Sequence, residues 1–494
     1  MSEQSQRRLT EQGVQEDLQR QPHLFMKLAE NAFTVAESLR SNYFHNTASF
    51  ITALRQTMHY ASLGERDPIL DVCAIKGADW EALRGEVVTF IDGGVGQVQI
   101  SSQVPILLRV GSYCVRTGER QLAEREQFGY YPVILGDLEG GSKERKDFID
   151  IVRITAELLG GLSALERTPD LRVLMFHGPL VYLMSGYAGH TAFTENDIDL
   201  FLRQYAPEPE LAKQIKEDFL REAKDIYYRL TGDVYRQWCN ERLFEPLSWI
   251  AFLYRRLINK ARQRNPTPLI CGVVERGGNL KEFSEKFLLE RVFKGLRDRS
   301  REDYFNDMYG RSDLNSPRAL LDKLGYTDSL LLAMLLEPGH YSEPWEIRSK
   351  YQGLSSAEVG KPDKPGKDRF QFSALGPENQ FGFPRVTGCY VHVSDTTEPI
   401  RVEVFSDLGQ VDEVVKRVCL YSRLLPGYGF PVGLDIADKH AHVPNWLTNA
   451  YGKLIKHQLG VSLQSGEIND AEMRQILIQA IYMTHRDWLF RPQS

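Results

Sequence analysis

Apolar and polar residues recur with different periods along the chain, and these periods predict where helices and strands lie. Over residues 1–65, apolar side chains return every three or four positions, which is the pattern of helices with one apolar face. From residue 86 to 135, β-branched and apolar runs alternate with glycine-rich segments, which indicates a meander or a set of hairpins. Within that region, GGVGQ at residues 93–97 is predicted to be a turn.

The next segments alternate between the two periods. Residues 143–166 are predicted to be helical, and the apolar run at 171–177 is predicted to be a strand that ends in a Gly-Pro turn. Strands, a helix and another strand in succession indicate an α/β layer in which the helix packs on the sheet. Further on, the pattern predicts helices over 195–265, 280–300 and 407–424, strands at 268–276, 387–395 and 399–405, and a last helical section after residue 428.

Composition narrows the class of protein. The chain of 494 residues is 42% hydrophobic and 26% charged, which is ordinary for a globular protein and excludes disorder as its main state. The longest apolar run, at residues 330–336, is far shorter than the roughly 20 residues that cross a membrane. The N-terminus has no apolar segment typical of a secretion signal, so we expect a cytoplasmic protein without a membrane segment.

Cysteine spacing and net charge exclude further classes. The six cysteines form no CxxC pair, which argues against a disulfide framework or a thiolate zinc site. The formal net charge of −6 gives no global argument for nucleic-acid binding, so any such binding must come from local patches. No GxxxxGK(S/T) loop occurs, so we do not expect the chain to hydrolyse ATP through a P-loop.

Three acidic positions are candidates for chemistry. Asp92, in FIDGG, follows an apolar strand and precedes two glycines that leave backbone room for a ligand; a hairpin turn is the alternative. Glu157 lies among apolar residues of a helix predicted to pack on the sheet; the alternative is an exposed position paired with Arg153. Asp438 and His442 can share one helix face, whereas the alternative is a polar helix start.

The order of these positions is more informative than any one of them. An acid on a first strand, an acid on the next helix, a polar residue ending the next strand and an acid on a late helix follow the arrangement of RNase H-like nucleases. Oxygen-rich sites suit Mg²⁺ or Mn²⁺. Two such ions about 3.5–4 Å apart would activate water and stabilise the leaving oxygen in phosphodiester cleavage.

Several blocks of the sequence resemble, in order, those of the NurA nuclease family. They are FIDGG, RITAE before a strand ending in HGPL, GVVERGG, TDSLLLAMLLEPGHYS, PIRVEVF and GFPVGLDIADKHAHV. The resemblance implies an α/β fold with an RNase H-like core, a mixed sheet flanked by helices. It implies a Mn²⁺-dependent (or Mg²⁺-dependent) nuclease that processes DNA ends, as a homodimer docked on a hexameric HerA-type ATPase, in DNA repair or anti-phage defence. It also implies metal-binding roles for Asp92, Glu157 and Asp438.

The sequence departs from the family pattern at three positions. The family has an aspartate after the second apolar strand, where this chain has His177, and we predict that His177 is the corresponding metal ligand. The loss of a hard oxygen ligand there favours Mn²⁺ over Mg²⁺. Phe430 stands where the family has a tyrosine, and Glu275-Arg276 replaces a Lys-Arg pair. Because of His177, the alternative is a weakened or inactive subunit with a structural or regulatory role on the ATPase.

A local basic run is the best candidate for DNA contact. It lies at the end of the predicted helical segment and has no acidic residue within it; the alternative is a solvated helix face paired with acids elsewhere. The predicted DNA-binding residues are Arg255, Arg256, Lys260, Arg262, Arg264 and the separate Arg276.

The resemblance also divides the chain into regions. We predict a helical N-terminal region at 1–80, the first part of the core at 81–195, a helical insertion at 196–265, a continuation of the core at 266–342, a Pro/Gly-rich insertion or loop at 343–385, and completion of the core with C-terminal helices at 386–494.

Overall fold

The structure is a computed structural model, and its contacts divide the chain into two units. The larger unit comprises residues 67–284 and 326–455, and the smaller comprises 1–66, 285–325 and 456–494. Each unit is described by itself. The residues described are 19, 22–45, 47–52, 69–71, 77–98, 106–121, 126–130, 133–135, 142–182, 195–205, 209–231, 246–275, 280–288, 317–347, 358–361, 364–371 and 384–482.

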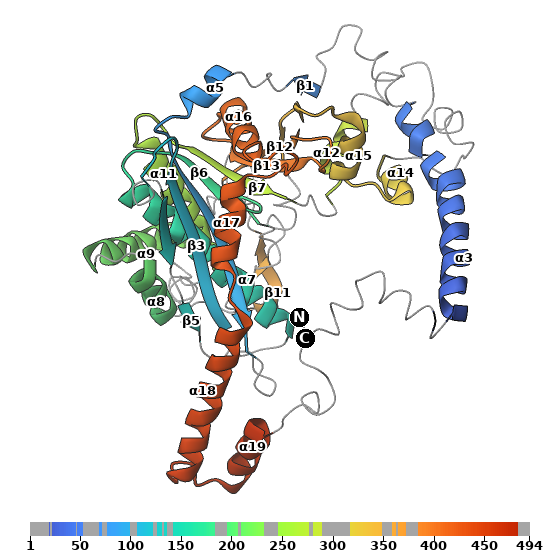
Figure 1. Ribbon diagram of the computed structural model, residues 1–494. Coiled ribbons are helices and arrows are strands. Elements are labelled where there is room, and N and C mark those ends of the chain that lie inside the picture. Colours follow the sequence, from blue (N-terminus) through green and yellow to red (C-terminus); the bar gives the residue numbers. More distant parts are fainter. Residues whose placement is uncertain are drawn as a thin grey trace. The chain divides into compact units, whose positions relative to one another are not determined.

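The larger unit is built on a mixed sheet of 11 strands (Figure 1). Its first part is an antiparallel meander of β2 (Val87–Gln97), β3 (Ile106–Arg116) and β4 (Glu126–Tyr130). After the helix α7 (Ser142–Arg167), β6 (Leu171–His177) pairs parallel with β2. The following strand, β7 (Leu269–Val274), pairs parallel with β6. The strand–helix–strand crossover between β2 and β6 matches the α/β layer that the sequence predicts.

The second part of the sheet is antiparallel. β13 (Ile400–Phe405) pairs with β7, and β12 (Val386–His392) pairs with β13. The complete order is β1-β8-β12-β13-β7-β6-β2-β3-β4, with β5 on β3 and β9 on β12. The short strands are β1 (Ile69–Asp71), β5 (Val133–Leu135), β8 (His340–Ser342) and β9 (Trp345–Glu346), and β10 (Glu358–Lys361) and β11 (Lys364–Gln371) form a separate two-stranded sheet.

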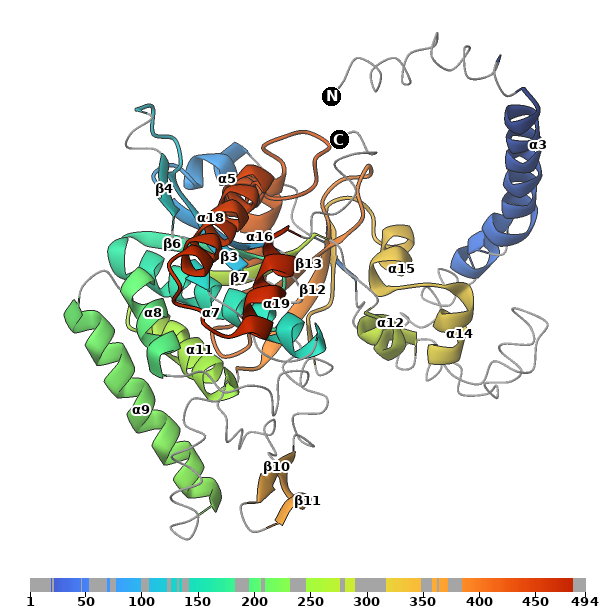
Figure 2. The same ribbon diagram turned by 90° about the horizontal axis from the view of Figure 1, so that it is seen from below.

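Helices cover both faces of the sheet. On one face, α7 brings Gly160 close to Val110 and Gly161 close to Phe176, because glycine leaves room for these apolar side chains. α11 (Pro246–Arg262) packs against α7. On the other face, α16 (Val411–Ser422) and α17 (Val432–Ala441) cover the apolar core, and α17 lies in front of β3 in Figure 1. Figure 2 shows α7 and α11 on the side of the sheet opposite to α16.

The remaining helices complete the list of described elements. The larger unit also contains α5 (Gly77–Ala82), α8 (Glu195–Tyr205), α9 (Pro209–Thr231) and α15 (Asp328–Leu335). The smaller unit contains α3 (Pro22–Ser38), the π-helix η1 (Leu39–Phe44), α14 (Pro317–Leu324) and α19 (Ala471–Tyr482). Two helices have residues in both units: α12 (Glu282–Phe287) and α18 (Asn445–Gln464).

The structure confirms the mixed α/β class with a central sheet flanked by helices, and corrects one local prediction. GGVGQ is not a turn, since β2 continues without interruption through these residues to Gln97. The segment 343–385, predicted as an insertion or loop, contains the strands β9, β10 and β11. The boundaries of the six predicted regions remain predictions. Among the described helices, none is both long and apolar enough to cross a membrane.

Candidate metal centre

Asp92, His177 and Asp438 meet at one place in the larger unit. Each offers one possible ligand atom, and these atoms all lie within 4.8 Å of one another. His177 Nδ1 lies 2.9 Å from Asp92 Oδ2, and the other oxygen, Oδ1, accepts a hydrogen bond from the Gly93 amide at 2.8 Å. We call these three residues the Asp–His–Asp cluster.

The parallel pairing of β2 and β6 brings the first two residues together. Ile91 of β2 stands opposite Phe176 of β6, so Asp92 and His177 each follow that pair by one position. Successive side chains of a strand point to opposite faces. Asp92 and His177 therefore point to the same face, the one covered by α17, and α17 contributes Asp438.

Glycines let α17 approach the sheet closely enough to complete the cluster. A Cβ at Gly94 would lie 2.2 Å from the carbonyl oxygen of Ala441, and a Cβ at Gly111 would lie 2.3 Å from that of Ala437. No real Cβ fits at such distances, so any larger residue would push the helix away. The space that the glycines leave thus receives α17 and not a ligand. The hairpin alternative for Asp92 is also wrong, because Asp92 lies inside β2 and is buried at 7% exposure.

The cluster contains two carboxyl groups and one imidazole, and each affects the pKa of its neighbours. Burial disfavours the imidazolium, but the hydrogen bond and charge of Asp92, with the charge of Asp438, outweigh this and raise the pKa of His177. Partial burial and the neighbouring Asp92 raise the pKa of Asp438. Both directions show a site where two carboxylates compete for one positive charge. The ring of Phe430 stands edge-on to His177, with ring centroids 5.4 Å apart.

Glu157 approaches β2 from the opposite face. A Cβ at Gly93 would lie 2.6 Å from Glu157 Oε1, and Gly93 faces the side opposite to Asp92 because it is the next residue of the strand. Arg153 Nη1 contacts Glu157 Oε1 at 3.0 Å, and the Tyr182 hydroxyl donates to Oε2 at 3.2 Å. Glu157 is therefore outside the Asp–His–Asp cluster, although the charges of Asp92 and His177 still act on its pKa. Its role as a ligand remains a prediction.

Burial dominates the chemistry of Glu157. The side chain is 4% exposed, and desolvation raises its pKa to about 7, although Arg153 opposes the shift. The guanidinium of Arg153 also lies over the ring of Tyr182, 5.0 Å from its centroid. The sequence offered both a buried position and a pair with Arg153 as alternatives, and the structure shows that Glu157 has both features.

A buried ionic contact holds the loop that follows His177. The amide of Leu180 donates to Glu403 Oε2 at 2.9 Å, and Arg401 Nε contacts the other carboxylate oxygen at 2.9 Å. The Tyr254 hydroxyl donates to the carbonyl of Leu180 at 2.9 Å. Glu403 is fully buried, so this anchor is rigid. Glu403 and Tyr182 were not predicted from the sequence, although an acid inside the apolar strand run PIRVEVF was a usable signal for Glu403.

The other predicted site residues lie away from the cluster. His442 caps the end of α17, and its carbonyl accepts a hydrogen bond from Arg109. Arg276 lies outside the described residues.

The basic run has acidic or carbonyl partners on other elements: Arg255–Glu222 at 2.8 Å, Arg256–Asp218 at 2.9 Å, Lys260–Glu166 at 3.4 Å, Arg262–Asp407 at 3.6 Å, and Arg264 Nη1 to the Thr168 carbonyl at 2.8 Å. These contacts favour the paired helix face over phosphate binding, which remains a prediction.

The donor set of the cluster fits a divalent cation. Two carboxylates and an imidazole are suitable ligands for Mn²⁺ and other transition metals, whereas Mg²⁺ prefers oxygen alone. Asp92 and Asp438, which raise the pKa of His177, also supply negative charge for a cation, and that cation would replace the imidazole proton on binding.

The comparison with protein families agrees with this chemistry. Residues 281–443 match the model of the NurA domain. The resemblance to the NurA family is confirmed. The matched segment includes Asp438 but begins after Asp92, Glu157 and His177. A comparison with curated proteins finds no match.

Solved NurA structures are similar to this chain at low identity. The NurA nuclease from Sulfolobus solfataricus is 13% identical, with a TM-score of 0.43, over 87% of this chain and 98% of that one. A NurA structure with manganese is 12% identical, with a TM-score of 0.35, over 85% and 93%. A third, NurA bound to dAMP and manganese, is 11% identical, with a TM-score of 0.30, over 87% and 94%. None is close enough to transfer the role of a residue.

Proposed function

We propose that this protein is a divalent-metal-dependent deoxyribonuclease that processes DNA ends. The observation that carries the proposal is the Asp–His–Asp cluster, in which two carboxylates and one imidazole converge from three separate elements. The match to the NurA domain supports it. The strand order β4-β3-β2-β6-β7, a meander followed by two parallel strands, supports an RNase H-like core for the first part of the sheet.

Asp92, His177 and Asp438 would hold the cation. A bound divalent cation in a nuclease activates water and stabilises the leaving oxygen. The chain itself orients the ligands, since the Gly93 amide fixes one oxygen of Asp92 and the buried Glu403 anchors the loop after His177. Because one ligand is an imidazole, we propose Mn²⁺ as the preferred cofactor and weak activity with Mg²⁺.

Glu157 would serve as a proton-exchanging group beside the cluster. A carboxyl with a pKa of about 7 can accept and release a proton at neutral pH. Arg153 and Tyr182 hold its two oxygens, so the carboxyl has a fixed position relative to Gly93.

The partners of the protein follow from the family resemblance. We propose that a homodimer acts in the cytoplasm with a HerA-like hexameric ATPase, in DNA repair or in anti-phage defence. The lack of a P-loop motif in the sequence supports a division of labour, in which the partner supplies the energy for moving along DNA.

Incubation with linear DNA tests the proposal directly. Single-stranded and double-stranded substrates are incubated with Mn²⁺ or with Mg²⁺, with and without a HerA-type hexameric ATPase. We expect degradation from DNA ends with Mn²⁺ and little with Mg²⁺. Intact DNA under every condition, with tight binding to the ATPase, would contradict a nuclease.

That result would favour a structural or regulatory subunit instead. The specific observation for this second function is that His177 stands where the family has an aspartate, so the cluster has one negative charge fewer. A subunit of this kind would change the ATPase rate of its partner without cleaving DNA.

A further inference from the structure

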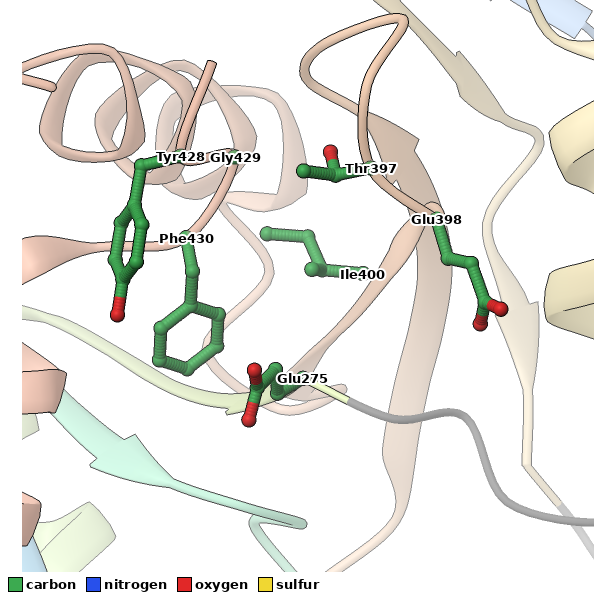
Figure 3. A pocket seen from close by; sticks show the side chains of 7 residues that line it. All are labelled: Glu275, Thr397, Glu398, Ile400, Tyr428, Gly429 and Phe430. Atoms are coloured by element: carbon green, nitrogen blue, oxygen red, sulfur yellow. The ribbon is translucent and has the colours of Figure 1, made fainter. Parts of the chain in front are cut away.

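A pocket of about 290 Å³ opens beside the Asp–His–Asp cluster (Figure 3). Its wall is made by the loop between β12 and β13, the loop between α16 and α17, and the residue that follows β7. Phe430 lines the pocket, and its ring is the one that stands 5.4 Å from His177. The pocket and the cluster therefore share a wall.

The two loops are fixed against each other. Thr396 Oγ1 donates to the carbonyl of Gly427 at 3.0 Å. Gly429 has a φ of 73°, and a Cβ there would lie 2.3 Å from Thr397 Oγ1, so the close approach requires glycine. The pocket is thus part of the folded structure and does not depend on a chance arrangement of side chains.

Tyr428 offers an aromatic surface at the mouth of the pocket. The residue is 40% exposed, and its hydroxyl is hydrogen-bonded to the carboxylate of Asp435, which restricts the ring. In Figure 3 its ring stands beside that of Phe430. Exposed aromatic rings of this kind stack with unpaired bases, whatever their sequence.

Glu275 offers a hydrogen-bond acceptor in the same pocket. In Figure 3 its carboxylate lies beside the Phe430 ring, whereas the carboxylate of Glu398 lies on the far side of Ile400. No hydrogen bond or ion pair joins Glu275 to another residue in the part of the chain that the structure describes. An ionised carboxylate accepts hydrogen bonds and donates none.

We propose that this pocket receives an unpaired base of a DNA end and selects it by its hydrogen-bond donors. The inference rests on the proposed nuclease function, because the neighbouring cluster would engage the phosphate of the same strand. Tyr428 stacks on the base, and Glu275 accepts hydrogen bonds from its edge.

The chemistry of Glu275 sets an order among the bases. Guanine presents an amino group and an adjacent ring N–H, which suit the two oxygens of one carboxylate. Adenine and cytosine present one amino group each, whereas thymine presents a single ring N–H flanked by two carbonyl oxygens. A carboxylate can accept from that N–H but is repelled by the oxygens beside it, so guanine is favoured and thymine is disfavoured.

Binding of single nucleotides tests the inference without any cleavage. The full-length protein is titrated calorimetrically with dGMP, dAMP, dCMP and dTMP in the presence of Mn²⁺. We expect dGMP to bind about tenfold more tightly than dTMP, as one good base contact provides. Glu275→Gln should reduce that ratio to about twofold, since an amide can donate to thymine. The control Glu413→Gln, an exposed glutamate of α16 that does not line the pocket, should leave the ratio unchanged.

Tyr428→Ala separates stacking from base selection. It should weaken all four nucleotides by about tenfold while keeping their order. Equal affinities for the four nucleotides, or a guanine preference that survives Glu275→Gln, would overturn the inference. So would a lack of nucleotide binding. If the base order is found but DNA is never cleaved, the pocket stands and the nuclease function fails; if DNA is cleaved without any base order, the reverse holds.

Discussion

Buried carboxylates lie on both faces of strand β2, but their positively charged partners differ between the two faces. On the α7 face, the carboxylate of Glu157 has its cation, Arg153, at 3.0 Å, and Tyr182 donates a further hydrogen bond. On the α17 face, Asp92 and Asp438 lie around His177, whose pKa they raise. Within the described residues, Glu157 thus has a guanidinium beside it, whereas the cluster joins two carboxylates to an imidazole.

This difference shows how a binding site can be distinguished from a structural ion pair. A buried carboxylate with a fixed guanidinium partner is already neutralised and gains little from a metal ion. A pair of carboxylates held together by an imidazole gains a full counter-charge when a cation binds. The α17 face is therefore where we expect the metal, and each of the following changes tests that assignment.

The largest effect is expected from removing a carboxylate on the α17 face. Asp92→Asn keeps the size of the side chain but loses its charge, so cleavage of linear DNA with Mn²⁺ should fall by at least about a hundredfold. Circular dichroism should show an unchanged fold. The exposed control variant Glu413→Gln, on α16 and outside the cluster and the pocket, should cleave as the original protein does. Full activity of Asp92→Asn would show that the cluster takes no part in DNA cleavage.

The next effect concerns the close approach of α17. Gly94→Ala places a methyl group against the Ala441 carbonyl and should lower the free energy of unfolding by about 2–3 kcal/mol. Gly460→Ala is the control, because a Cβ at that glycine of α18 has open space around it and alanine favours helix. Urea denaturation measures both. Equal stability of the two variants would mean that α17 does not need this glycine.

Asp92 and Gly94 also show what could and could not be predicted from the sequence. Asp92 and Asp438 were candidates from local pattern, whereas His177 was predicted as a ligand only through the family resemblance. The purpose of Gly94 was misjudged, since its neighbour Ala441 is distant in the sequence. Tyr182 and the acids that pair with the basic run could not be predicted either, because their roles depend on contacts between residues that are distant in the sequence. Only Glu403 could have been noticed, as an acid within an apolar strand.

On the α7 face, the measurable consequence is a pH dependence of stability. The pKa of Glu157 is about 7 in the folded protein and near 4.5 when unfolded, so the folded state holds more protons between these values. Stability should therefore fall as the pH rises from 5 to 8. Glu157→Gln should reduce that fall by about 2 kcal/mol, measured by denaturation in the presence of EDTA.

The same experiment contains its own control. The raised pKa of His177 also makes stability fall as the pH rises, and this part remains in Glu157→Gln because His177 is intact. If the variant and the original protein lose equal stability between pH 5 and 8, burial does not raise the pKa of Glu157.

The choice of metal should respond to the third member of the cluster. His177→Asp replaces an imidazole with a hard oxygen ligand, so cleavage supported by Mg²⁺ should rise by about tenfold. Rates with Mg²⁺ and with Mn²⁺ are measured side by side. Strong Mg²⁺-dependent cleavage by the unaltered protein, unchanged in His177→Ala, would mean that His177 is not a ligand.

The smallest effect is expected on α11, away from both faces of β2. Arg255→Glu breaks a partly exposed ion pair with Glu222 and should cost about 0.5–1 kcal/mol of stability. Because the structure pairs this residue with an acid, the dependence of DNA affinity on salt concentration should stay the same. A flatter dependence would instead establish the phosphate contact that the basic run suggests.

Binding of Mn²⁺ itself, followed by the electron paramagnetic resonance of the free ion, tests the central claim most directly. We predict that the full-length protein binds Mn²⁺, that Asp92→Asn and Asp438→Asn each abolish this binding, and that Glu157→Gln retains it. Binding that survives Asp92→Asn, or that is lost only in Glu157→Gln, would contradict the assignment of the metal to the α17 face.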